Sequence, residues 1–262
     1  MSNVLIITVE TYDDSFDRET ARNSEIYASG VALKKFRENE TENSDDKESG
    51  SKKEHGDRKD SKKKQKKYAS VIHISLPRRD DKGNKITESV ADAIKAYREQ
   101  LKGKKFCRIE IIGHGDSNGL LGPGKPGSKD ENIGDSNDPF AKFIADFYDG
   151  PSADDLNGGA GGGSGGGGSE ESEAEEDGDA TEDNNIIVWA CDCGDTDFGA
   201  TIATIADTNV VTFDGIVNFW QYEPSNDPEE NEKNRENGEP ITPPEPDENA
   251  DPVVNTPTPD EL

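Results

Sequence analysis

Two short motifs carry the side chains best suited to chemistry. VWACDCGD, residues 188–195, ends an apolar run with two of the chain's three cysteines, Cys191 and Cys193. IIGHG, residues 111–115, ends another apolar run with His114 and Gly115. In α/β proteins the loops at the carboxyl ends of the strands line the ligand crevice. Both motifs therefore stand where a thiol and an imidazole can act on a bound ligand.

The types of these residues predict nucleophilic catalysis. If the two strands are neighbours, their ends lie roughly 5 Å apart, which is close enough for a thiol and an imidazole to cooperate. We expect Cys191 to be the nucleophile and His114 to act as base and then as acid, because only the thiolate attacks and an adjacent imidazole favours it. The backbone N–H groups of Gly115 and Cys191 are expected to face the developing oxyanion.

Less specific interpretations of the same residues stay open. A cysteine at a strand end is often a small buried hydrophobe, and a His-Gly pair is a common turn. Cys193 is ambiguous between a passive neighbour, a redox partner and a metal ligand. A zinc site from His114, Cys191 and Cys193 would lack an obvious fourth ligand. We therefore expect no metal and no cofactor, and we assign Cys107, which begins an apolar run, to the core.

The elements that must position the motifs alternate between strand and helix patterns. Short apolar runs predict buried strands, and apolar residues at helical spacing predict helices. This alternation predicts a mostly parallel sheet with helices on both of its faces. The predicted strands are 3–9, 70–76, 106–113, 185–190 and 209–213, and the predicted helices are 16–39, 88–101, 139–148 and 198–206.

The composition indicates that these elements form only part of the chain. Hydrophobic residues make up 29% and charged residues 33% of the 262 residues, which is too lean for a packed globule of that size. Residues 46–67 carry a net charge of +5, residues 149–184 contain no Lys or Arg, and residues 221–262 carry −11. We expect one domain over residues 1–222, disordered insertions at about 41–67 and 150–184, and a disordered, acidic, Pro-rich tail over 223–262.

The charge also bears on partners and location. A net charge of −27 argues against nucleic acid as the main partner, because binding to phosphates needs a basic face. The first residues lack the basic start of a secretory signal, and no apolar run reaches membrane-spanning length, so we expect a cytoplasmic protein without a membrane partner. The expected partner is a protein or peptide substrate, and the charged insertions are candidates for recruiting partner proteins.

The order of the motifs resembles the caspase-like clan of cysteine peptidases, which includes caspases, metacaspases and CHAT-type domains. Gly113-His114-Gly115 after one strand and ACDCG, residues 190–194, after the next are similar to the clan's catalytic motifs. VLIITVETYDDSF, residues 4–16, is similar to its first strand. The resemblance implies a caspase-like three-layer fold and a cysteine endopeptidase with His114 and Cys191 as its dyad. The alternative is a catalytically inactive caspase-like interaction module.

Two departures from the clan's pattern concern substrate binding. Trp189 stands two residues before Cys191, where metacaspases carry an aspartate that helps to bind a basic substrate side chain. The Pro- and Glu-rich composition after residue 222 predicts that the later strands of the sheet are missing or minimal. Asp13 and Asp14 follow the first strand and would favour a basic residue at the cleavage site, whereas Arg18 and Arg22 would favour an acidic one.

Overall fold

The elements alternate along the chain much as the sequence predicts. The computed structural model describes residues 2–11, 25–40, 67–80, 84–86, 88–125, 127–133, 139–153, 185–194, 196–218 and 244–258. The elements are β1 (Ser2–Val9), α2 (Glu25–Asn39), β2 (Tyr68–Leu76), α3 (Val90–Gln100), β3 (Arg108–Gly113), β4 (Gly115–Asp116), β5 (Gly119–Leu121), β6 (Asn132–Ile133), α4 (Pro139–Phe147), β7 (Ile186–Trp189), α7 (Asp197–Ala206), β8 (Val210–Asp214), β9 (Val217–Asn218), β10 (Glu245–Pro246) and β11 (Asp251–Asn255). Asp13, Asp14 and nearly all of the two insertions lie outside the described residues.

A six-stranded sheet with the order β11-β8-β7-β3-β1-β2 forms the centre of the fold. Within this sheet, the pairs β2–β1, β1–β3, β3–β7 and β7–β8 are parallel, and β11 is antiparallel to β8. β3 and β7 are buried along their whole length, as expected for central strands covered on both faces. The prediction of an α/β fold with a mostly parallel sheet is confirmed.

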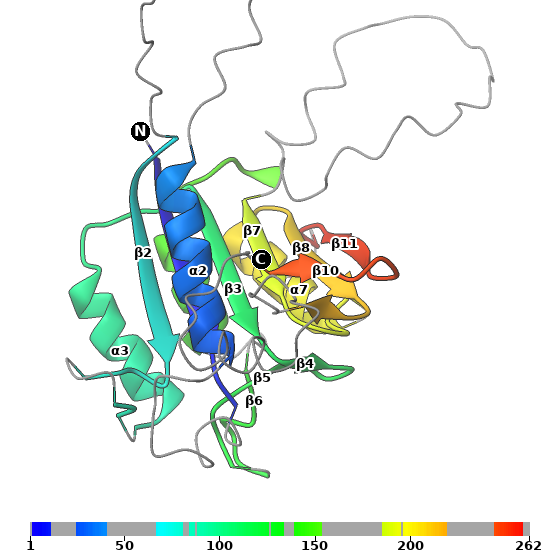
Figure 1. Cartoon of the computed structure of the whole chain (residues 1–262), viewed down its shortest axis with the longest axis horizontal. Coiled ribbons are helices and arrows are strands. Elements are labelled where there is room, and N and C mark those ends of the chain that lie inside the picture. Colours follow the sequence, from blue (N-terminus) through cyan, green and yellow to red (C-terminus); the bar gives the residue numbers. More distant parts are fainter. Residues whose placement is uncertain are drawn as a thin grey trace, which may run out of the picture.

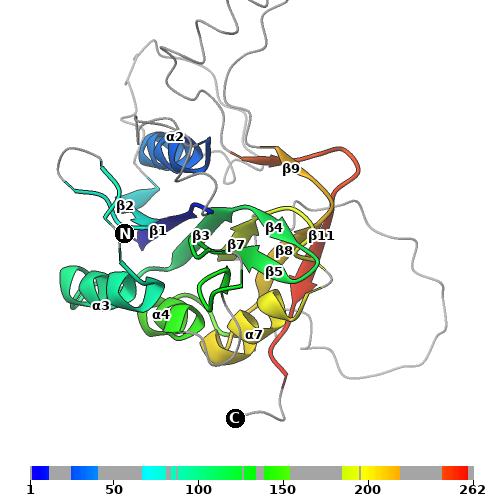
Figure 2. The same cartoon turned by 90° about the horizontal axis from the view of Figure 1, so that it is seen from below.

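Helices cover the two faces of the sheet unequally. Figure 2 shows α2 on one face and α3, α4 and α7 on the other, so the described part of the chain forms three layers. In Figure 1, α2 lies across the first strands of the sheet, and its contacts are with β1, β2 and β3. Within the described residues, no helix has the length and apolar character needed to cross a membrane.

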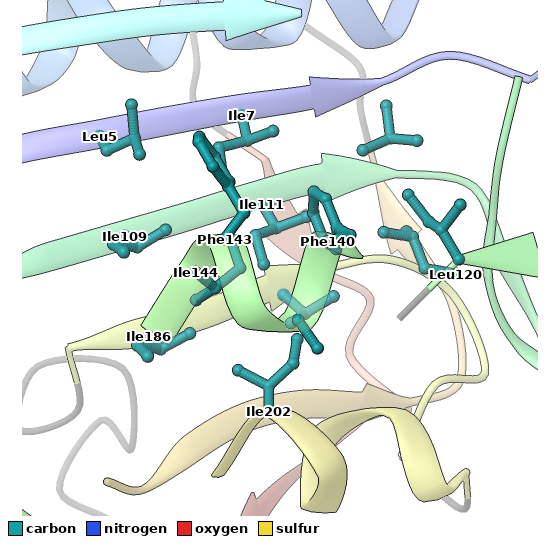
Figure 3. Close-up of a cluster of buried hydrophobic side chains, with 14 of the residues drawn as sticks. Leu5, Ile7, Ile109, Ile111, Leu120, Phe140, Phe143, Ile144, Ile186 and Ile202 are labelled. Carbon is teal, nitrogen blue, oxygen red and sulfur yellow. The ribbon is translucent and has the colours of Figure 1, made fainter. Parts of the chain in front are cut away.

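The larger hydrophobic core lies between the sheet and the three-helix layer. Apolar side chains from β1, β3 and β7 meet Phe140, Phe143 and Ile144 of α4 and Ile202 of α7 (Figure 3). A second, smaller cluster lies on the face covered by α2. Successive residues of a strand point to opposite faces, so the unbroken apolar runs of β1 and β7 supply both clusters.

The C-terminal segment corrects the sequence prediction. Residues 223–262 are expected to be a disordered tail, but Asp251–Asn255 form β11, the outer strand of the main sheet. All five residues of β11 pair with residues of β8, and β10 pairs with β9. The prediction of a disordered tail is therefore wrong for Asp251–Asn255, and the later strands are not wholly missing. Local composition misled because this strand is largely exposed and is placed by pairing with β8 rather than by an apolar run.

Candidate active site

The structure places His114 and Cys191 at corresponding positions on neighbouring strands. β3 and β7 are adjacent and parallel, and Ile112 lies opposite Trp189 in their register. His114 is two residues beyond Ile112, and Cys191 is two residues beyond Trp189. Both residues are half-buried and follow the last residues of their strands at the carboxyl edge of the sheet.

Gly115 brings the two motifs into contact. A Cβ atom at this position would lie 2.3 Å from the carbonyl oxygen of Cys191 and 2.5 Å from Sγ of Cys193. Real Cβ atoms do not approach other atoms so closely, so only glycine fits between the histidine loop and the cysteine loop. The oxyanion role predicted for the N–H groups of Gly115 and Cys191 stays a prediction.

The Cys191 thiol is held by a strand that sequence reasoning did not connect with it. The backbone N–H of Val217 in β9 donates to Cys191 Sγ at 3.3 Å, and the thiol donates to the Val217 carbonyl oxygen at 3.7 Å. Cys191 also packs against the cluster on the α2 face, which includes Trp189 and Val217. No signal near Cys191 points to this contact, because Val217 lies 26 residues further along the chain.

Cys193 has a structural position. Its side chain is fully buried and belongs to the cluster on the three-helix face, whereas Cys191 packs against the cluster on the opposite face. Burial is the main cause that raises the pKa of the Cys193 thiol to about 12, and the nearby Cys191, Asp116 and Asp192 contribute to this shift. Cys193 is therefore protonated and unreactive near neutral pH. Among the described residues, no group of three or more His, Cys, Asp and Glu side chains is placed to hold a metal ion.

Hydrogen bonds to β8 and to the residue after it fix the loop that carries both cysteines. Asp192 adopts a left-handed conformation with φ of 50°, and its N–H donates to the Gly215 carbonyl at 2.9 Å. The N–H of Gly194 donates to the Phe213 carbonyl at 2.9 Å. The left-handed backbone at Asp192 interrupts the strand alternation, under which residues two apart would face the same side, consistent with the two cysteines entering different clusters.

A buried charge cluster lies at the end of β1, beside the histidine loop. Val9 lies opposite Gly113, so Glu10 follows β1 at the level at which His114 follows β3. The Glu10 carboxylate is fully buried and binds Arg79 at 2.7 Å and Lys85 at 2.8 Å. Sequence reasoning missed Glu10, although it stands directly after an apolar run. Asp13 and Asp14, the predicted substrate-binding residues, lie outside the described residues.

A second buried carboxylate joins the strands that carry the two motifs. Glu110 of β3 accepts hydrogen bonds from Arg37 of α2 at 2.7 and 3.2 Å, from Arg108 at 2.8 Å and from the Trp189 indole of β7 at 3.0 Å. Burial alone would raise the pKa of Glu110, but the charges of Arg108 and Arg37 and the hydrogen bonds lower it to about 2. The side chain of Trp189, two residues before Cys191, is therefore engaged in a structural hydrogen bond.

Comparison of the chain with protein-family models, with curated proteins and with solved structures finds no match.

Proposed function

We propose that the protein is a caspase-like cysteine endopeptidase in which Cys191 is the nucleophile and His114 the general base. The observation that carries the proposal is the placement of these two residues at matching positions after the adjacent parallel strands β3 and β7. The tight contact between Gly115 and the Cys191 carbonyl supports it, since it holds the two loops together. The antiparallel β11 supports it further by supplying a later strand of the kind that the clan's sheet requires.

The proposed reaction is hydrolysis of a peptide bond in two steps. His114 takes the proton of the Cys191 thiol, and Sγ attacks the carbonyl carbon of the scissile bond. The C–N bond then breaks, the amine leaves with the proton from His114, and a thioester remains on Cys191. Water, deprotonated by His114, attacks the thioester, which releases the carboxylic acid product and restores the thiol. The N–H groups of Gly115 and Cys191 are proposed to stabilise the oxyanion in both steps.

Kinetics of matched variants test this proposal. Hydrolysis of a library of fluorogenic peptides by the full chain should be lost in both Cys191→Ala and His114→Ala. Cys107→Ser, which changes another half-buried thiol, is the matched control and should keep the native rate. Hydrolysis that survives in Cys191→Ala would count against the peptidase.

The cleavage preference is a finer part of the proposal. Asp13 and Asp14 favour cleavage after basic residues, and the tract from Lys47 to Lys67 offers ten such sites, whereas residues 149–184 offer none. Mass spectrometry of the incubated protein should therefore find Cys191-dependent cuts in the first tract. Cuts confined to the acidic segment, after residues such as Asp177, would instead show a preference for acidic residues.

The second candidate is a catalytically inactive caspase-like interaction module whose charged insertions recruit partners. The two contacts between Cys191 Sγ and Val217 favour it, because they occupy the thiol with backbone groups of the same chain. The partners captured by the native protein and by Cys191→Ala distinguish the two functions. Identical partners and identical biological effects of both proteins would favour the module.

A further inference from the structure

β9 approaches the candidate nucleophile with its backbone. The N–H and the carbonyl of one residue, Val217, both contact Cys191 Sγ, at 3.3 and 3.7 Å. The sulfur thus lies at one edge of β9, where a neighbouring strand would otherwise lie, and β10 pairs with β9 in an antiparallel manner. The Val217 side chain is 2% exposed and belongs to the same hydrophobic cluster on which Cys191 packs.

These two contacts limit access to the sulfur. A thiol is both a weak donor and a weak acceptor, so Cys191 Sγ contacts the Val217 carbonyl and the Val217 N–H together. The backbone of β9 therefore lies against the atom that would attack a substrate.

We propose that β9 is a latch that shields Cys191 Sγ, and that the thiol becomes accessible when β9 moves away from it. The inference rests on the proposed function, because it concerns the regulation of the same site. The latch acts through the backbone of Val217, and the buried Val217 side chain anchors it in the cluster.

The C-terminal segment supports the latch. The chain enters β9 through Gly215, which has φ of +113° and whose Cβ position is 3.0 Å from Cα of Ala250. Asp247 donates its N–H to the Ile216 carbonyl at 2.8 Å, and Pro246 of β10 pairs with Val217. The position of β9 therefore depends on residues 244–250, and a displacement of that segment is expected to release the thiol.

Alkylation of Cys191 by iodoacetamide tests the latch without requiring catalysis. The full chain carrying Cys107→Ser is alkylated at neutral pH, and modification at each cysteine is followed by peptide mass spectrometry. Val217→Ala weakens the anchor of β9, so Cys191 should react faster than in the parent, on the order of tenfold. Val211→Ala is the matched control, since Val211 is a fully buried valine of the same cluster on β8, and it should leave the rate near the parent value.

Buried Cys193 reports whether each variant is folded, because it should stay unmodified in a native protein. A Cys191 rate in folded Val217→Ala that is no faster than in Val211→Ala overturns the latch. If Val217→Ala exposes Cys193, Gly215→Ala decides, with Gly103→Ala as its control. Both glycines have positive φ, but a Cβ at Gly103 meets nothing within 4 Å. If Cys191 reacts faster in Gly215→Ala but not in Gly103→Ala, the latch is supported. Equal Cys191 rates in the two variants overturn it.

Failure of the latch and failure of the peptidase are distinguishable in this design. Accelerated alkylation of Val217→Ala, without hydrolysis of any peptide by that variant, supports the latch and counts against the peptidase. Hydrolysis that depends on Cys191, together with equal alkylation rates in Val217→Ala and Val211→Ala, supports the peptidase and overturns the latch.

Discussion

His73 of β2 is a half-buried imidazole on the face of the sheet that α2 covers. Its Nε2 lies 3.1 Å from the Thr8 hydroxyl, and its ring centroid lies 5.1 Å from that of Tyr27. Burial is the main cause that lowers the pKa of His73 to about 3, and the positive charges of Lys34 and Arg79 contribute to this shift. His73 is therefore neutral in the folded protein near neutral pH. In the unfolded chain, its pKa is near the ordinary value of 6.5.

This difference predicts a dependence of stability on pH. Between about pH 6.5 and about pH 3 the unfolded chain binds a proton that the folded protein does not, so the stabilisation is complete above that window and is lost as the pH falls. From about pH 7.5 to about pH 5 the loss from this residue is roughly 2 kcal/mol. Urea unfolding at both pH values measures this loss. Between the two pH values, the native protein should lose this much more stability than the His73→Gln variant does. An equal loss in both proteins would contradict the assignment.

At the scale of elements, Glu110 connects α2, β3 and β7. Its carboxylate is fully buried and accepts hydrogen bonds from Arg37 of α2, Arg108 of β3 and Trp189 of β7. Removing one partner of a buried charge pair leaves the other charges without compensation, which costs far more than the pair itself contributes. The network therefore determines how α2 sits on the strands that carry His114 and Cys191.

Replacing the charge of Glu110 is expected to weaken the whole sheet. Glu110→Gln leaves Arg37 and Arg108 beside a neutral amide, and urea unfolding near neutral pH should show a loss of roughly 3–5 kcal/mol. The exposed Glu99 on α3 is the matched control, and Glu99→Gln should change stability by less than about 0.5 kcal/mol.

Because the pKa of Glu110 is about 2, its contribution to stability is present above about pH 4.5 and is lost as the pH falls towards 2. A variant as stable as the native protein would refute this role.

At the scale of the whole molecule, β11 brings the end of the described chain back to the sheet. The strand pairs with β8 over five residues, and the Asn255 amide donates to the Val210 carbonyl at 3.2 Å and to the Thr212 hydroxyl at 2.8 Å. Figure 2 shows β11 beside β8 at the side of the sheet far from β2. The C-terminal segment therefore contributes to the fold and is not a separate tail.

Two truncated chains separate the contribution of β11 to stability from that of the residues after Thr258. A chain that ends at Ala250 lacks β11 and exposes the edge of β8, and it should lose roughly 2–5 kcal/mol if each ladder hydrogen bond contributes about 1 kcal/mol net. A chain that ends at Thr258 keeps β11 and should unfold at the same urea concentration as the full chain. Equal midpoints for all three proteins would show that β11 does not stabilise the sheet.

The sequence by itself determined the elements whose signal is local. The apolar runs of β1, β3 and β7 and the helical spacing in α3 and α4 are patterns within one segment, so they predict each element and the mostly parallel sheet. The same runs placed His114 and Cys191 at strand ends, because a residue's position in a strand follows from its own neighbours.

The tertiary structure alone decided which distant segments meet. β11 has no apolar run of its own and becomes a strand through pairing with β8, and the Val217 backbone contacts Cys191 across 26 residues of chain. The two cysteines, which lie two positions apart, enter opposite clusters, and the turn at Asp192 between them is tied to Gly215 by a hydrogen bond. Long-range pairing and burial arise from contacts between segments, and local periodicity does not encode which segment will supply them.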